Sequence, residues 1–415
     1  MHNIISSNPR NELSHRERVL QSLAHKEPDR VPIDLGGMDS TSIHAIAYKK
    51  LKKHLGITAG VVQINDTYQV LPKVEKEVVE RVGADILPVQ FDAREYKTGK
   101  LPDGSEAEFP QRWNPETRAD GSEVICDSSG GITAIRPESG YYFEPVSYPL
   151  RNAETITDIE KQKHLFDEVD WPFYCDQTLE EMGDRARILF EETDYLIMGN
   201  FMVHIFAGGQ MLRGFDNFLI DLISRPALAE CVLENLTNAF MKRFDKYAEL
   251  IGPYVQVINV NDDLGTQENT FISPKLYRKM VKPYHSKLYH YMKSKWPGKI
   301  FLHSDGAISS IIPDLIEAGV DIINPVQLSA KGMDPEKLKT EFGDQLTFWG
   351  GGCDTQYILP QGTPRMVKDE VKKRIDQLAP GGGFVFCQVH NILPDVPVEN
   401  IVAMYEAVHE FGYYS

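Results

Sequence analysis

The sequence lacks any hydrophobic run long enough to cross a membrane. No stretch of about 18 consecutive apolar residues occurs among its 415 residues, and the first ten residues contain no apolar core of the kind that a signal peptide needs. Cysteine is also scarce, with five scattered residues and no Cys-x-x-Cys pair. These absences exclude a disulfide framework and predict a cytoplasmic protein with free thiols and no membrane partner.

Positive charge is in deficit as well. The chain carries 44 basic and 60 acidic residues, a formal net charge of −16, which argues against binding to nucleic acid or to an anionic membrane surface. No Gly-x-Gly-x-x-Gly motif follows the first predicted strand, and this weakens a dinucleotide-binding interpretation. The remaining composition, 42% hydrophobic and 25% charged, is that of an ordinary globular protein.

Strand-like and helix-like segments alternate along the chain. The strand candidates are mostly continuous apolar runs, which is typical of strands buried on both faces. They are residues 31–35, 86–90, 195–200, 255–260, 299–303, 320–324, 346–350 and 384–388. This alternation predicts an α/β fold, a single (β/α)8 TIM barrel over residues 1–415, with a doubly wound open sheet as the competing topology.

One segment, residues 93–194, breaks the alternation after the second strand. It contains two Asp-Gly turn signals, Asp103-Gly104 and Asp120-Gly121, flanked by short β-type runs. We expect a β-rich insertion here that forms a lid or cap subdomain over the face where barrel active sites lie. An edge decoration or a dimer arm is the alternative.

The residues that follow the predicted strands are unusually polar. His303 and Asp305 share one strand-end turn, and His390 follows the last strand. Nitrogen and oxygen ligands from three positions around an open site are typical of catalytic Zn²⁺, so we predict that these three residues bind zinc. Cys387 is a further candidate ligand. Alternatively, His303 and Asp305 hydrogen-bond to each other and cap the next helix.

A second polar group follows the fourth predicted strand. Asp262 and Asp263 form a candidate acid/base pair, and Asn261, which precedes them, is a further catalytic candidate that could orient the substrate. The alternative is that one of the two carboxylates caps a turn. We expect several other residues at strand ends to bind substrate, namely Met38, Met202, His204, Asn324 and Gln327.

Several sequence blocks resemble the uroporphyrinogen decarboxylase superfamily. Residues 18–23 and 27–32, Arg-Val-Leu-Gln-Ser-Leu and Glu-Pro-Asp-Arg-Val-Pro, are similar to its opening motif. Later blocks agree as well, at residues 272–277, 348–351, 390–392 and 397–400. The resemblance implies a (β/α)8 barrel. It also implies one of two chemistries, metal-free decarboxylation of uroporphyrinogen or zinc-dependent methyl transfer involving a corrinoid protein.

Two departures from the superfamily favour methyl transfer. The decarboxylases carry an Arg-Gln-Ala-Gly-Arg segment after the first strand, whose arginines hold substrate carboxylates; here residues 36–41 are Gly-Gly-Met-Asp-Ser-Thr. The thiol-type methyltransferases have a His-x-Cys turn and a later Cys, whereas this chain has His303-x-Asp305 and His390 at those places. This harder ligand set suits activation of an ether oxygen or an amine nitrogen rather than a thiol.

The resemblance and these departures together predict an O-demethylase component. The enzyme would transfer a methyl group from a small O-methylated donor, such as a methoxylated aromatic compound, to the cob(I)alamin of a partner corrinoid protein, with Zn²⁺ as cofactor. A metal-free decarboxylase or other lyase is the alternative. A non-catalytic carrier of corrinoid is disfavoured because the chain has no Asp-x-His-x-x-Gly motif.

Overall fold

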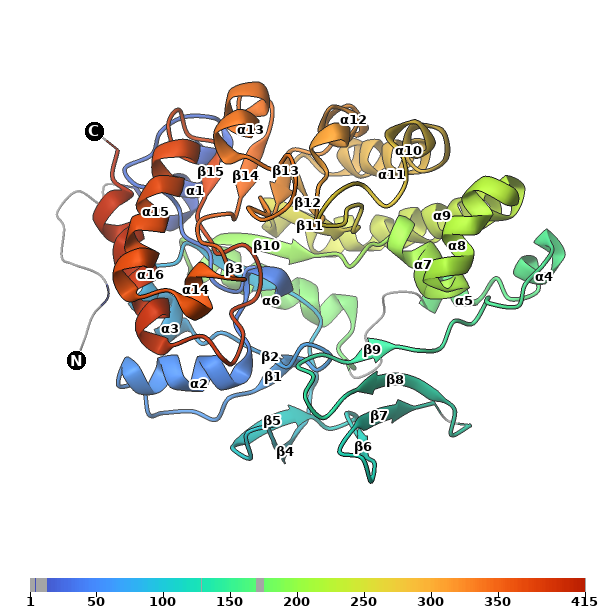
Figure 1. Cartoon of the computed structure of the whole chain (residues 1–415), viewed down its shortest axis with the longest axis horizontal. Helices are drawn as coiled ribbons and strands as arrows, with labels where there is room; N and C mark the ends of the chain where they lie inside the picture. Colours follow the sequence, from blue (N-terminus) through green and yellow to red (C-terminus); the bar gives the residue numbers. More distant parts are fainter. Residues whose placement is uncertain (1–3, 5–12, 128, 169–174, 415) are drawn as a thin grey trace.

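The computed structural model describes residue 4 and residues 13–127, 129–168 and 175–414. Its centre is a curled parallel sheet of seven strands in the order β15-β14-β13-β12-β11-β10-β3 (Figure 1). The strands are β3 (Ile86–Val89), β10 (Leu196–Asn200), β11 (Val257–Asn261), β12 (Lys299–His303), β13 (Ile322–Asn324), β14 (Thr347–Trp349) and β15 (Phe384–Val385). Each coincides with one of the predicted strands, and the α/β barrel prediction is confirmed.

The remaining predicted strand, residues 31–35, lies between the two edges of this sheet. Ile33 pairs with Phe386 in a parallel bridge, and Asp34 N donates to Phe386 O at 2.8 Å. On the other side, Asp85 N donates to Ile33 O at 2.7 Å. The segment therefore joins β15 to the start of β3, although Pro32, which has no N–H, interrupts the regular hydrogen-bond ladder.

Helices surround the strands, as Figure 1 shows. No helix in the described ranges is long and apolar enough to cross a membrane. The helices are α1 (His15–Leu23), α2 (Ala45–His54), α3 (Lys76–Val82), α6 (Leu179–Glu192), α7 (Phe206–Arg213), α8 (Phe215–Ser224), α9 (Pro226–Leu250), α10 (Pro274–Met280), α11 (Lys282–Lys295), α12 (Ile312–Ala318), α13 (Pro335–Phe342), α14 (Ile358–Gln361), α15 (Pro364–Leu378) and α16 (Val398–Phe411).

The predicted insertion is β-rich and lies on one side of the barrel (Figure 1). It holds the hairpin β4 (Tyr96–Lys100) with β5 (Glu106–Pro110), and an antiparallel sheet of β6 (Glu116–Thr117), β7 (Glu123–Cys126), β8 (Ile132–Arg136) and β9 (Glu144–Pro145). The short hairpin β1 (Ile64–Asp66) and β2 (Leu71–Pro72) joins it through contacts of β1 with β5. We call β1, β2 and β4–β9 the β-rich cap.

The connection returns to the barrel through α4 (Ile156–Glu160), α5 (Leu165–Glu168) and α6. Helix α6 packs on β3 and β10, so the last part of the predicted lid segment contributes to the ring of helices. Both turn signals occupy turns, because Gly104 and Gly121 have φ of 79° and 80°, a region that favours glycine.

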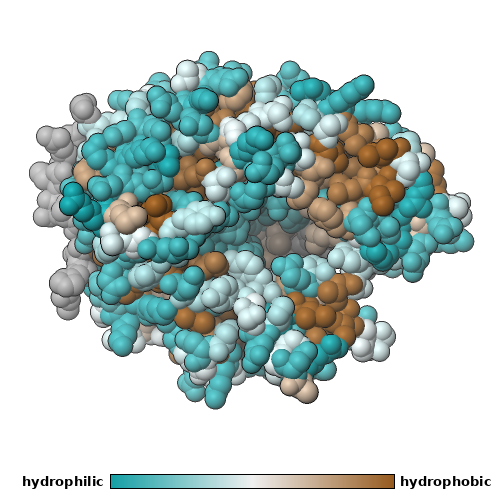
Figure 2. Space-filling view, viewed as in Figure 1, coloured by the Kyte–Doolittle hydropathy of each residue, from teal (hydrophilic) through white to brown (hydrophobic). Residues whose placement is uncertain are grey.

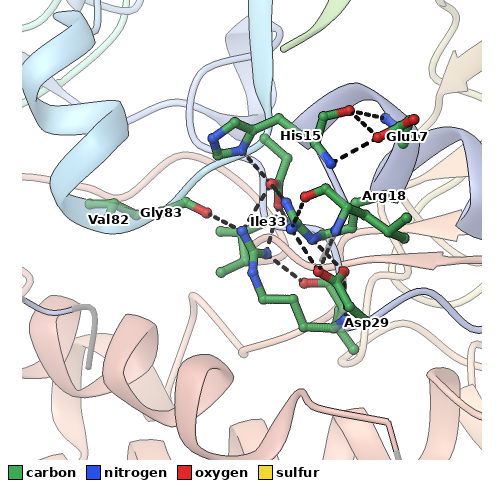
Figure 3. Close-up of polar contacts among 12 residues, drawn as sticks. His15, Glu17, Arg18, Asp29, Ile33, Val82 and Gly83 are labelled. Atoms are coloured by element: carbon green, nitrogen blue, oxygen red, sulfur yellow. Dashed lines mark hydrogen bonds and ion pairs between the residues drawn. The ribbon is translucent and has the colours of Figure 1, made fainter. Parts of the chain in front are cut away.

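A buried ion cluster holds the N-terminal segment to the start of β3 (Figure 3). The Asp85 carboxylate accepts hydrogen bonds from Arg18 and Arg30, both at 2.7 Å, and lies 2.7 Å from His15 Nδ1. Burial alone would raise the pKa of Asp85, but the charge of Arg30 and the contacts with His15 and Arg18 hold it well below its usual range. Since Asp85 precedes β3, this cluster lies at the N-terminal end of the barrel and serves stability rather than catalysis.

Candidate metal centre

The structure brings together the three residues predicted to bind zinc. His303 is the last residue of β12, Asp305 lies two residues further on, and His390 follows β15. One ligand atom from each lies within 4.8 Å of the other two. Asp305 Oδ2 is 3.9 Å from His303 Nε2 and 3.7 Å from His390 Nε2. Ligands of a tetrahedral zinc ion stand roughly 3.3 Å apart, so small side-chain movements would complete such a site.

The orientation of His303 is determined by Asn324. The Asn324 amide nitrogen donates to the Trp349 carbonyl at 2.8 Å, so its amide oxygen faces His303 Nδ1 at 2.7 Å. Nδ1 therefore carries the proton, and Nε2 presents its lone pair toward Asp305. This is how metal-binding histidines are usually oriented, by an acceptor on the opposite ring nitrogen. Asn324 was predicted as a substrate-binding residue; in the structure its side chain positions His303, a candidate metal ligand.

The turn that carries Asp305 is held by two of the other predicted residues. Asp263 accepts a hydrogen bond from Asp305 N at 2.8 Å, and Gln327 accepts one from Gly306 N at 2.6 Å. Gly306 has a φ of 94° and packs against the backbone of Gly265, where an added Cβ would collide. These contacts give Asp263 and Gln327 a role in shaping the turn.

His390 completes the group from the last strand of the barrel. Its ring centroid is 5.8 Å from that of His303. Burial lowers the pKa of His390, and the opposing charge of Asp305 raises it by less. The neutral imidazole is therefore favoured, and this is the form that binds a metal ion.

Asp262, predicted as an acid/base residue, has its carboxylate fully engaged. It accepts hydrogen bonds from the backbone N–H groups of residues 205–207 at the start of α7, at 2.6–3.0 Å. It also lies 2.7 Å from His285 Nε2, and His285 Nδ1 is 3.0 Å from the Tyr277 hydroxyl. Only 1% of Asp262 is exposed. These contacts match the alternative that the carboxylate caps a structural element.

Two further candidates lie in the core of the barrel. Met38 and Cys387 are 1% and 0% exposed and pack in one buried cluster with Phe301 and Trp349. Burial, and then the charge of Asp34, raise the pKa of the Cys387 thiol well above its ordinary value, which disfavours a metal-binding thiolate. Within the part of the chain that the structure describes, Cys387 does not join the group of His303, Asp305 and His390.

Three candidates lie beside the mouth of the barrel at the ends of β10 and β11. Met202 is partly buried and adopts a left-handed backbone with φ of 52°. His204 lies near Asp39, whose pKa it lowers. Asn261 N donates to Val203 O at 3.0 Å, which ties the two strand ends together. Asn261 is also the register partner of His303 in the parallel pairing of β11 with β12.

Two residues that sequence reasoning left without a role follow the first strand segment. The Ser40 hydroxyl lies 3.1 Å from His303 Nε2. Burial, and then the negative charge of Asp66, raise the pKa of Asp39 to about 7. Both belong to the polar segment 36–41, so the departure from the decarboxylase pattern was the available signal.

The β-rich cap adds Asp66 and Tyr142 to the same mouth. The pKa of Tyr142 is raised to about 12, chiefly because its hydroxyl group is buried. A hydrogen bond with Asn391 lowers this pKa, whereas the negative charges of Asp66 and Asp305 raise it further. Asp66 accepts hydrogen bonds from Gln69, whose own side chain accepts one from Asn391 at 2.7 Å. No sequence signal placed these residues near the barrel, because their approach depends on the path of the cap.

A cavity of about 280 Å³ adjoins this mouth between the first strand segment, β2 and β3. Its lining includes Met38, Asp39, Asn65, Asp92 and Arg185. Figure 2 shows the face of the molecule hollowed near its centre, between the barrel and the β-rich cap.

Comparison with known proteins identifies the family to which the chain belongs. The uroporphyrinogen decarboxylase (URO-D) family model matches residues 156–411, well over half of the chain. The chain therefore belongs to the uroporphyrinogen decarboxylase family, and the resemblance in its motifs is confirmed.

Individual relatives are distant. A uroporphyrinogen decarboxylase of Geobacter sulfurreducens is 23% identical over 272 residues, covering 64% of this chain and 72% of the relative. The uroporphyrinogen decarboxylase of Geobacter metallireducens is 28% identical over 265 residues, which cover 62% of this chain and 71% of the relative. A solved structure of a methyltransferase from Methanosarcina mazei has a TM-score of 0.58 at 17% identity and covers 96% of this chain and 99% of its own. This last similarity is one of fold.

Proposed function

We propose that the protein is a corrinoid-dependent methyltransferase that demethylates a small O-methylated compound. The observation that carries the proposal is the group of His303, Asp305 and His390 at the mouth of the barrel, with Nε2 of His303 directed toward the other two ligands. A His/Asp/His set with an open position is typical of catalytic rather than structural zinc.

The chain's own residues fit a zinc ion in two further respects. Asn324 supplies the acceptor that holds His303 in the required tautomer, and Asp263 and Gln327 hold the turn of Asp305. When bound, Zn²⁺ would act as a Lewis acid toward the ether oxygen of the methyl donor. The ligand set is harder than the thiolate set of thiol-type enzymes, which suits an oxygen leaving group.

We further propose that Asp39 supplies the proton that the departing oxygen requires. Its pKa of about 7 lets the carboxyl group keep its proton near neutral pH. It lines the cavity that adjoins the mouth, next to Ser40, which contacts His303. The methyl group itself would pass to cob(I)alamin on a partner corrinoid protein, with the β-rich cap closing over the donor or binding that partner.

The first-strand segment argues against a substrate with many carboxylates. Residues 36–41 contain no arginine, and Asp39 and Asp66 make this side of the mouth acidic. A polyanion would meet carboxyl groups there and none of the bidentate arginine contacts that carboxylates favour. A small neutral or singly charged donor is compatible with the same surface.

The test is a methyl-transfer assay with the purified full-length protein. Methoxylated aromatic compounds are incubated with free cob(I)alamin, and methylcobalamin and the released phenol are measured, with uroporphyrinogen decarboxylation measured in parallel. We expect transfer by the wild type and by His290→Ala, an exposed histidine distant from the site, and a loss of at least about 100-fold in His303→Ala and His390→Ala. Porphyrinogen decarboxylation without methyl transfer would refute the proposal.

A further inference from the structure

A second cavity lies inside the β-rich cap. Its volume is about 290 Å³, close to the lower end of the range for small-molecule sites, roughly 300 Å³. It is bounded by the β4–β5 hairpin, by the sheet β6–β9 and by the loop that follows β1. None of the three candidate zinc ligands lines it, so it is distinct from the site at the barrel mouth.

Aromatic rings form the apolar walls of this cavity. Trp113 and Phe143 are 4% and 5% exposed, and their ring centroids are 5.2 Å apart at an interplanar angle of 88°. Phe109 leans over Gly99 on the neighbouring strand, where an added Cβ would lie 2.8 Å from the Phe109 ring. Flat walls of this kind favour a planar ring, which gains offset or edge-to-face contacts.

The cavity also has six polar lining residues, of which three are basic and one, Glu123, is acidic. The Thr67 hydroxyl is buried, with 0% of the residue exposed, and it has no hydrogen-bond partner among the described residues. Lys97 and Lys100 line the cavity from β4. Arg136 also lines it, but it is paired with Glu123 at 2.5 Å, so that these two charges neutralise each other.

Lys97 is the partly buried charge that remains for a ligand, since Lys100 is exposed to solvent. Its side chain is half-buried, and across residues 13–127, 129–168 and 175–414 no carboxylate oxygen is found within 4.0 Å of its ammonium group. A partly desolvated ammonium without a counter-ion attracts an anion more strongly than an exposed one does.

We propose that this cavity binds a planar aromatic carboxylate, with the ring between Trp113, Phe143 and Phe109. The carboxylate faces Lys97, and the Thr67 hydroxyl hydrogen-bonds to the carboxylate or to a polar ring substituent. An unpartnered hydroxyl in a mostly apolar cavity is costly unless a ligand satisfies it, and this is the reason to expect an occupant rather than an empty void.

The cavity shares its wall with the mouth of the barrel. Thr67 directly follows Asp66, and Phe143 directly follows Tyr142, so each pair contributes one residue to the cavity and one to the mouth. A bound ring would therefore hold in place the backbone that carries Asp66 and Tyr142. The site does not depend on the proposed methyl transfer, since it requires neither zinc nor a corrinoid protein.

The experiment is isothermal titration of the full-length protein with 4-methoxybenzoate and benzoate, and with 4-methoxybenzamide as the uncharged analogue. The variants are Thr67→Val and Lys97→Met, with Lys53→Met, an exposed lysine on α2, as the matched control. The same titrations on the double variant His303→Ala/His390→Ala separate this cavity from the barrel mouth. Thermal unfolding of each variant reports on its stability.

We expect the wild type to bind both carboxylates saturably. The affinity should be about tenfold weaker in Thr67→Val and in Lys97→Met. It should be unchanged in Lys53→Met and in the double histidine variant. The amide should bind at least about tenfold more weakly. Thr67→Val should not lower the melting temperature, because the hydroxyl that it removes has no partner in the protein. Absence of binding, or binding that depends on the histidines but not on Thr67 and Lys97, would overturn the proposal.

Discussion

Asn324 determines which nitrogen of His303 faces the mouth of the barrel. Replacing it with leucine removes the acceptor for Nδ1–H, so both tautomers become accessible and the ring loses its fixed orientation. We expect Asn324→Leu to weaken zinc binding by about 10- to 100-fold, measured by competition with a chromophoric chelator. Asn400→Leu is the matched control, because Asn400 is another buried asparagine whose amide donates to two backbone carbonyls. Equal losses in both variants would contradict a specific role for Asn324.

The raised pKa of Asp39 makes a prediction about pH. In the unfolded chain the carboxyl group titrates near 3.9, whereas in the folded protein its pKa is about 7. Between these values only the folded state holds the proton, so this group makes the free energy of unfolding fall as pH rises from about 4 to about 7. Asp39→Asn should lose that slope in urea denaturation curves. An unchanged slope would show that Asp39 ionises normally.

At the residue scale, the sequence predicted that His303, Asp305 and His390 lie close together, but it did not predict the contacts around them. His303, Asp305 and His390 follow strands, and strand ends of a barrel meet at one face, so their proximity followed from the topology. The role of Asp262 could not be predicted in this way, because the backbone N–H groups that donate hydrogen bonds to it lie 55–57 residues earlier, at the start of α7. Ser40 carries no local signal for its contact with His303.

Among the elements, α7 depends on Asp262 for its start. Three backbone N–H groups at its N-terminus donate to this carboxylate. Asp262→Asn replaces one acceptor oxygen with a donor and should lower the free energy of unfolding by about 1–3 kcal/mol. Asp263→Asn keeps an acceptor for Asp305 N and should change it by less than about 0.5 kcal/mol. Lost turnover in Asp262→Asn at unchanged stability would instead support the acid/base prediction.

The N-terminal segment is joined to β3 through Asp85. Removal of this carboxylate in Asp85→Ala leaves Arg18 and Arg30 buried without their counter-ion, and we expect a loss of about 3–5 kcal/mol. Because the pKa of Asp85 is depressed in the folded protein, its stabilisation is present above about pH 4 and is lost as pH falls below that value. Acid unfolding should therefore begin at a higher pH in any variant that weakens the cluster. Unfolding curves of Asp85→Ala that match the wild type would contradict this.

Strand positions could be predicted well from continuous apolar runs, and their ends shifted by only a few residues. Residues 31–35 show the limit, since Pro32 interrupts the ladder although the segment occupies the position of a strand. The β-rich cap was predicted as a β-type insertion from its Asp-Gly turns. The contact of β5 with β1 could not be predicted, because β1 precedes β3 in the chain and β5 follows it.

For the whole molecule, the family and the fold leave two chemistries open, and our proposal of methyl transfer rests on the mouth of the barrel. The excess of acidic residues, the absence of arginine in residues 36–41 and the histidine–carboxylate group all favour a metal-dependent enzyme with a small donor. The β-rich cap contributes Asp66 and Tyr142 to this mouth and encloses a second cavity behind them. Substrate selection is therefore expected to depend on the cap as well as on the barrel.

The most direct measurement is the zinc content of the purified full-length protein, determined by mass spectrometry of the metal after dialysis. We predict about one zinc ion per chain in the wild type and in His290→Ala, and almost none in His303→Ala/His390→Ala. Methyl transfer should disappear on chelation and return when zinc is added. A wild-type protein that binds no metal, or a double variant that keeps its full zinc content, would contradict the account.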